Sequence, residues 1–160
     1  MTEIDSFQLI RKDPADGDPY REPQCEVVHR GRPLGLTIAG ARLEAQFEVN
    51  RGSYVLLVTD DTPYEETLRA YLLDGDGRII DRTRLGYAYT AGVLRDIQIV
   101  GERSVVFAFT SEARFRLTVH ARPQRFWNVS GGVGEAVRFL LGRRLELTRD
   151  PKHAQQEISK

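Results

Sequence analysis

The feature that most constrains the fold is a succession of short segments in which apolar and polar residues alternate with a period of two. The clearest runs from Ala41 to Val49, where odd positions are apolar and even positions are polar. This alternation is typical of a strand with one buried face, because successive side chains of a strand point to opposite faces of the sheet. Turn-forming Gly, Asp and Asn separate such segments at intervals of about 8 to 14 residues. The sequence therefore predicts a mainly β protein.

Two segments depart from this alternation because both of their faces are apolar. Residues 53–59 and 67–74 are largely apolar throughout, which is typical of strands in the centre of a sheet. Asn50-Arg51-Gly52 supplies a turn, so residues 41–49 and 53–59 are expected to form a hairpin. After residues 67–74, a turn at Asp74-Gly75-Asp76-Gly77 is expected to let residues 78–82 pair back.

The C-terminal half of the chain predicts a meander. Segments 93–100, 103–110 and 114–120 are joined by short connections, which make consecutive strands antiparallel neighbours. Residues 135–141 have helical spacing and predict one short helix, and residues 144–148 alternate again as a last strand. We therefore expect an antiparallel meander of about 8 to 10 strands, forming a sandwich or a strongly bent barrel, with one short C-terminal helix.

The length of 160 residues fits one domain. Residues 1–24 are acidic and rich in proline towards their end, and we expect them to form a mobile arm. Residues 25–149 are expected to form a single β domain. Residues 150–160 contain one large apolar side chain and predict a disordered tail.

Composition excludes several function classes. The chain carries 23 basic and 23 acidic residues, so no net charge attracts it to nucleic acid or to an anionic membrane. No apolar run approaches the roughly 20 residues that cross a bilayer, and the N-terminus lacks the features of a secretory signal. A single cysteine forms no internal disulfide. We expect a cytoplasmic protein, and three lysines among 23 basic residues indicate a bacterial, GC-rich genome.

The zero net charge hides two segments of opposite sign. Residues 1–24 contain three basic and six acidic residues, whereas residues 111–149 contain eight arginines and three acidic residues. The even positions of segment 114–122 form a cationic row that is a candidate interaction face for an acidic protein. The alternative is a solvated face partly neutralised by Glu102, Asp96 and Asp81, or by the acidic arm folding back onto it. The candidate residues are Arg114, Arg116, His120 and Arg122.

Two further surface features are candidate sites. The first is an acidic loop with four carboxylates in seven residues, which suit a hydrolase pair, a metal site or an exposed binding loop. Its members are Asp60, Asp61, Glu65 and Glu66. The second is an aromatic rim near predicted turns, which suits a pocket mouth or an interface anchor, or else core packing. Its members are Tyr87, Tyr89 and Trp127.

Catalytic and metal-binding motifs are weak. Cys25 and His29 lie four residues apart on a predicted strand, and His120 can join them only from another strand. The alternative is that the cysteine is a small residue at the sheet edge. Asp74 to Gly77 resembles a fragment of a calcium loop but is better explained as a hairpin turn. The glycine-rich segment from Gly131 to Gly134 lacks the lysine and the preceding apolar strand of a phosphate-binding loop, so we interpret it as a hinge or a turn. We expect no metal and no cofactor.

Three hypotheses for function follow. The first is a non-catalytic macromolecular binding protein of the inhibitor, immunity or adaptor type, with a protein partner held on a charge-polarised sheet surface. The second is a small-ligand-binding barrel or sandwich whose cavity is lined by Tyr54, Tyr71, Tyr87, Phe107 and Phe109. The third is a hydrolase that combines the loop at residues 60–66 with an arginine of segment 114–122. RNA binding is a weaker possibility, and unpaired sheet edges make a homodimer possible.

Overall fold

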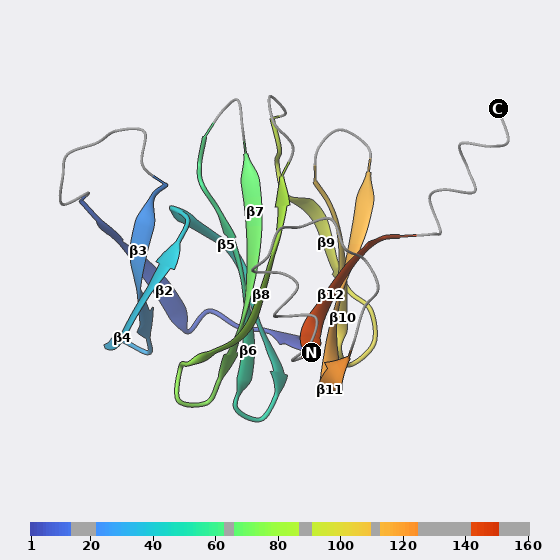
Figure 1. The fold of residues 1–160 in the computed structure, drawn as a ribbon, viewed down its shortest axis with the longest axis horizontal. Helices are drawn as coiled ribbons and strands as arrows, with labels where there is room; N and C mark the ends of the chain where they lie inside the picture. The colour runs from blue at the N-terminus through green and yellow to red at the C-terminus, as the bar shows by residue number, and fades with distance from the viewer. Residues whose placement is uncertain (14–21, 63–65, 87–90, 110–112, 125–141, 151–160) are drawn as a thin grey trace, which may run out of the picture.

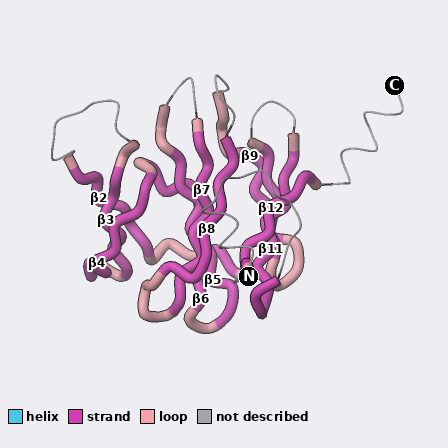
Figure 2. Tube along the Cα trace, viewed as in Figure 1, coloured by secondary structure: helices cyan, strands magenta, loops and turns pink. Residues whose placement is uncertain are grey.

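A computed structural model describes residues 1–13, 22–62, 66–86, 91–109, 113–124 and 142–150. Within these residues the chain forms twelve strands and no helix (Figure 2). Every strand pairing is antiparallel. The predicted fold class, a mainly β antiparallel protein, is confirmed.

The strands form three sheets, named here by their place in the molecule. The central sheet has the order β1-β5-β6-β7-β8, and its strands are β1 (Thr2–Glu3), β5 (Arg42–Asn50), β6 (Ser53–Thr59), β7 (Thr67–Asp74) and β8 (Ile79–Gly86). The N-terminal sheet has the order β2-β3-β4, with β2 (Phe7–Lys12), β3 (Gln24–His29) and β4 (Arg32–Ala39). The C-terminal sheet has the order β12-β11-β10-β9, with β9 (Arg95–Ile99), β10 (Ser104–Ala108), β11 (Arg114–Gln124) and β12 (Arg143–Arg149).

The central sheet lies between the other two sheets (Figure 1), and each of its faces belongs to a different hydrophobic core. The first core joins the central sheet to the C-terminal sheet, with Leu57 on one side and Phe107 on the other. The second core joins it to the N-terminal sheet, with Leu56 on one side and Val27 on the other. Neighbouring residues of β6 thus enter different cores, as the period of two requires. This arrangement explains why β6 and β7 are apolar on both faces.

The hairpins and the meander expected from the sequence are present. Strand β5 pairs with β6, and β7 pairs with β8 across the turn at residues 74–77. In that turn Asp74 Oδ1 accepts hydrogen bonds from the backbone N–H of Asp76 and of Arg78 at 3.0 and 2.8 Å. Strands β9 to β12 follow one another across the C-terminal sheet as a meander. The helix expected at residues 135–141 lies outside the described residues.

The third sheet was not predicted, and its presence corrects the expected arm at residues 1–24. Residues 2–3 and 7–12 of that segment are strands, and β2 pairs with β3 along its whole length. The Gln46 side chain of β5 also binds Phe7, accepting from its N–H at 2.7 Å and donating to its carbonyl at 3.1 Å. The remaining arm residues 14–21 lie outside the described part of the chain. At the other end, Asp150 is buried, so the expected tail does not begin there.

A buried carboxylate joins the central sheet to the C-terminal sheet at one edge. Asp81 on β8 accepts hydrogen bonds through Oδ2 from the backbone N–H groups of Arg144 and Leu145 on β12, each at 2.8 Å. Its Oδ1 accepts from the N–H of Arg82, also at 2.8 Å. Strand β12 is an edge strand, so no neighbouring strand accepts hydrogen bonds from these N–H groups. Asp81 therefore replaces a missing strand partner.

Gly40 is required where the chain passes from β4 to β5. Its φ is +118°, and a Cβ there would overlap Cγ1 of Val58. We expect Gly40→Ala to lower the free energy of unfolding by about 2–4 kcal/mol, because strain and overlap add. Gly35 is the matched control, since its φ is +66° and a Cβ would meet no atom within 4 Å. Gly35→Ala should cost about 1 kcal/mol, and equal losses in urea denaturation would contradict the role of the overlap.

Removing the Asp81 carboxylate should open the edge between the two sheets. We expect Asp81→Ala to cost about 3 kcal/mol, because two backbone N–H groups of β12 lose their acceptor and at least one of them is buried. Asp76→Ala removes an exposed carboxylate of the neighbouring turn and should change the unfolding free energy by less than about 0.5 kcal/mol. Hydrogen exchange of Leu145 N–H should accelerate in the first variant alone. Unchanged exchange at that amide would show that Asp81 does not hold β12.

Candidate functional site

The cationic row predicted on β11 occupies the outer face of the C-terminal sheet. The odd residues Phe115, Leu117 and Val119 are buried in the first core, and the even residues from 114 to 120 are half-buried on the opposite face. The register between β11 and β12 becomes irregular after Val119, and Arg122 is exposed beyond that point. The alternation of this strand was therefore predicted correctly up to residue 120.

Strand β12 and the residue after it supply the negative partners of this row. Arg116 Nη2 lies 3.2 Å from Asp150 Oδ1, and His120 Nε2 lies 2.9 Å from Glu146 Oε2. Asp150 is 7% exposed, so the first of these pairs is well shielded from water. Two of the acids expected to neutralise the row make other contacts: Asp96 accepts from Arg114 through its backbone carbonyl at 3.5 Å, and the Asp81 carboxylate holds β12.

The paired side chains hold the outer face in a fixed arrangement. Arg144 of β12 extends across the strands and donates from Nε to the carbonyl of His120 at 3.0 Å. Two small apolar residues, Val106 and Ala108, stand directly opposite Arg116 and Arg114 in the register and are 3% and 7% exposed. The stems of arginine side chains can lie over apolar neighbours while their guanidinium groups stay at the surface. The outer face thus combines ordered arginines with an apolar base.

The acidic loop has a structural role that the sequence did not show. Glu66 is 7% exposed, and its carboxylate accepts hydrogen bonds from the backbone N–H groups of Asp60, Thr62 and Thr67 at 2.7 to 3.1 Å. These bonds hold the start and the end of the loop together. Asp61 is exposed and lies 3.9 Å from Arg42, and Glu65 falls outside the described residues.

Asp60 belongs to a charge cluster with two residues that the sequence analysis missed, Arg69, which is buried, and Glu22, which is exposed. Its Oδ2 lies 3.0 Å from Nη2 of Arg69 on β7, and the same nitrogen forms an ion pair with Glu22 ahead of β3. Burial raises the pKa of the Asp60 carboxyl, and Arg69 opposes this shift. The signal that could have identified Arg69 is a charged residue inside the apolar run from Leu68 to Leu73, close in sequence to an acidic loop.

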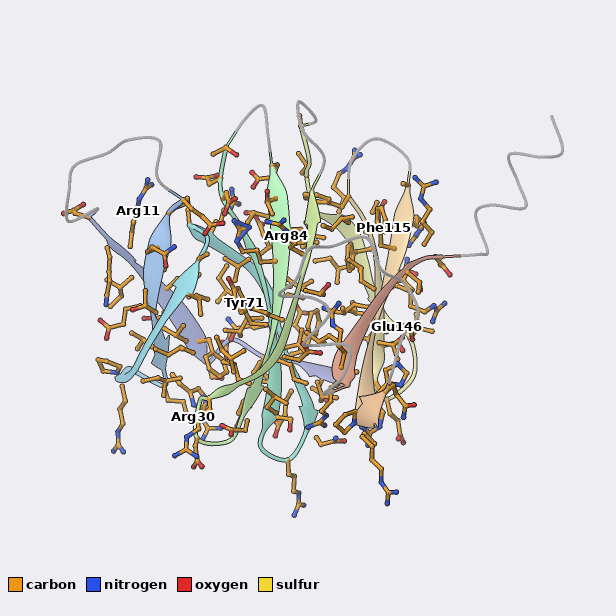
Figure 3. The ribbon with its side chains drawn as sticks, in the orientation of Figure 1. Arg11, Arg30, Tyr71, Arg84, Phe115 and Glu146 are labelled. Atoms are coloured by element: carbon orange, nitrogen blue, oxygen red, sulfur yellow. The ribbon has the colours of Figure 1, made fainter. Side chains whose placement is uncertain are left out.

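The acidic loop and the cationic row do not meet in one cleft. Leu68 and Ala70 point into the first core, so the intervening Arg69 points to the side of the N-terminal sheet. Tyr71 lies on that same side of the central sheet, whereas Glu146 lies across the molecule on the C-terminal sheet (Figure 3). The first core separates the two regions. The hydrolase hypothesis required these two regions to converge, and the structure keeps them apart.

The residues of the hypothetical ligand cavity are divided between the two cores. Phe107 and Phe109 pack in the first core, whereas Tyr71 and Tyr54 pack in or against the second. The Tyr71 hydroxyl donates to the carbonyl of Ala39 at 2.8 Å. The central sheet stands between these pairs, so they do not line one cavity. Three aromatic candidates lie outside the described residues: Tyr87, Tyr89 and Trp127.

The Cys25 and His29 pair is not a catalytic dyad. Both residues lie on β3, where four residues of strand span about 13 Å. Burial raises the pKa of the Cys25 thiol, which disfavours the reactive thiolate. The His29 ring stacks on Phe7 with 4.2 Å between centroids, and burial lowers its pKa. His120 belongs to the C-terminal sheet, on the far side of the central sheet.

The described chain presents no arrangement for metal binding, since no group of three or more His, Cys, Asp or Glu is placed to hold an ion. None of its described segments is a helix long and apolar enough to cross a membrane. Neither a family model, nor a curated protein, nor a solved structure matches this chain. Its function is therefore inferred from its own surfaces.

The raised pKa of Asp60 has a measurable consequence for stability. The folded state binds the carboxyl proton of Asp60 more tightly than the unfolded chain does. The wild-type protein should therefore gain stability relative to Asp60→Asn as the pH falls through the pKa that Asp60 has in the folded state. Urea denaturation of both proteins from about pH 7 to pH 4 measures this difference. Carboxyl ¹³C titration of Asp60 gives the pKa directly. A difference between the two proteins that does not change with pH would contradict the assignment.

Proposed function

We propose that this chain is a non-catalytic binding protein of the inhibitor, immunity or adaptor type, which docks an acidic protein on the outer face of its C-terminal sheet. The observation that carries the proposal is the set of ordered arginines on that face. Arg114, Arg116 and Arg144 are half-buried there, and at least one donor of each is already held by a neighbouring group. A side chain that is already ordered loses less conformational entropy when a partner binds.

The chemistry of the face suits a carboxylate-bearing protein surface. A guanidinium group offers donors in a planar fork, so it can keep one partner within the chain and bind a second carboxylate from outside. Both faces of the central sheet are covered by other sheets, whereas no described sheet covers this face of the C-terminal sheet. No Phe, Tyr or Trp in the described part of β11 or β12 lies on the outer face beside the arginines, which favours a protein partner over RNA.

We also propose that the protein acts in the bacterial cytoplasm. The support is the arginine-rich composition and the single cysteine, Cys25, which is buried as a free thiol. A free thiol is typical of a reducing compartment.

Charge reversal on this face should abolish partner capture without unfolding the protein. Arg114→Glu combined with Arg122→Glu leaves the Arg116–Asp150 and His120–Glu146 pairs intact. We expect retention of an acidic protein from the native cell extract to fall about tenfold or more, and to weaken with added salt. Arg51→Glu combined with Arg78→Glu makes the same charge change at exposed turns of the central sheet and should retain the partner.

Circular dichroism and urea denaturation of both double variants show that each one is folded before capture is compared. Equal retention by the two double variants would overturn the proposed face. Loss of the captured material after nuclease treatment would replace the protein partner with a nucleic acid, and would equally overturn the proposal.

A further inference from the structure

Exposed apolar side chains gather at one edge of the C-terminal sheet. Six large apolar residues are exposed in the described chain, and four of them lie on β9 or beside it. These are Val93, Ile97, Ile99 and Val100, with exposed fractions from 37% to 63%. Strand β9 is an edge strand whose neighbour is β10, and all five of its residues are exposed. An apolar edge strand is a surface on which another strand can pair.

The hydrogen-bond pattern shows which backbone groups of β9 point away from the sheet. The N–H of Val100 donates to the carbonyl of Ser104 at 2.8 Å, so Val100 faces β10. Gln98 stands opposite Val106 and faces the same way, because residues of an antiparallel ladder alternate between the two sides. Ile97 and Ile99 therefore direct their N–H and C=O groups out from the edge. Their side chains lie on the face shared with Val105, which is in the first core.

We propose that β9 pairs antiparallel with β9 of a second copy of this chain, about a two-fold axis at Gln98. In this register Ile97 of each copy pairs with Ile99 of the other, so both outward-facing residues of both copies form hydrogen-bonded pairs. The four isoleucines then meet on one face. Gln98 faces its own counterpart in a non-hydrogen-bonded pair. The surface is self-complementary, as a two-fold interface requires.

The charges at the two ends of β9 suit this register. Asp96 has a φ of +52°, and the pairing with β10 shifts by one residue here, as in a β-bulge. The shift puts Arg95 opposite Ala108, on the same face as Gln98. Two-fold symmetry brings this end of β9 to the turn after β9 of the other copy, where Glu102 is exposed and Arg103 is half-buried. Arg95 of each copy thus lies near Glu102 of the other copy, which is more exposed than its neighbour Arg103.

The proposed pairing of the two β9 strands uses up the β9 edge of both copies. It joins two C-terminal sheets through their β9 edges and leaves β12 at both ends of the combined sheet. The N–H groups of Arg144 and Leu145 on β12 already donate to Asp81. The combined sheet therefore ends in two β12 strands whose N–H groups at Arg144 and Leu145 are already bound, which favours an assembly of two copies. This inference uses an edge of the sheet and does not depend on the acidic partner proposed for its outer face.

A cysteine at the symmetry axis tests the register directly. In a non-hydrogen-bonded antiparallel pair the Cα atoms lie about 4.5 Å apart, which a disulfide can bridge. We expect Gln98→Cys to oxidise to a covalent dimer. Arg51→Cys, at an exposed turn of the central sheet, should stay monomeric under the same conditions, and buried Cys25 should stay reduced in both. If the two variants form dimer equally, the contact is a random collision and the proposal fails.

A proline on the free edge tests the hydrogen bonds. Ile99→Pro removes an N–H that points away from β10, so the sheet keeps its own bonds while the edge loses a donor. Sedimentation at up to about 100 μM should show a dimer for wild type and for Ile99→Ala, and a monomer for Ile99→Pro. A monomeric wild-type protein would overturn the proposal. This holds even if its β9 edge binds an extended peptide instead of a second copy. Equal dimer in the proline variant would overturn it as well.

Discussion

The fold depends on a central sheet that is apolar on both faces. Strands β6 and β7 place side chains such as Leu57 and Leu72 on one face and Leu56 and Tyr71 on the other, all of them 3% exposed or less. Each large side chain contributes roughly 1.5–3 kcal/mol when it is buried, so neither face is stable in contact with water. The central sheet needs two covers, and the N-terminal and C-terminal sheets supply them.

This demand explains where the polar groups lie. Inside the layers, charged side chains occur with partners: Arg69 lies between Asp60 and Glu22, and Asp81 accepts backbone N–H groups from the next sheet. Burying a charge without a partner would cost several kcal/mol. Two carboxylates of the predicted catalytic or metal-binding cluster thus have structural roles: Glu66 holds the ends of its loop together, and Asp60 pairs with Arg69.

The C-terminal sheet has one face that the core does not use and, at β9, an apolar edge on which no described strand pairs. These two features carry the proposed activities. Pairing through β9 would set two outer faces side by side in one continuous sheet, with their arginine rows related by the two-fold axis. A partner with two acidic patches could then bind both copies at once, and its second contact would form at a high effective concentration. Dimer formation and docking are separate properties that the same sheet can combine.

The sequence by itself determined strands β5 to β12 of the central and C-terminal sheets, because alternating and apolar runs are local properties. The pattern of residues 41–49, the apolar faces of residues 53–59 and the alternation of β11 each predict a strand from a few neighbouring residues. Only the tertiary structure decided that residues 7–12, whose continuation is rich in Pro and Asp, form a strand of a third sheet. It also decided the partners of the charged residues, such as Arg69 with Glu22, 47 residues apart. Such pairings depend on how sheets stack, and stacking is a property of the whole chain that no local pattern records.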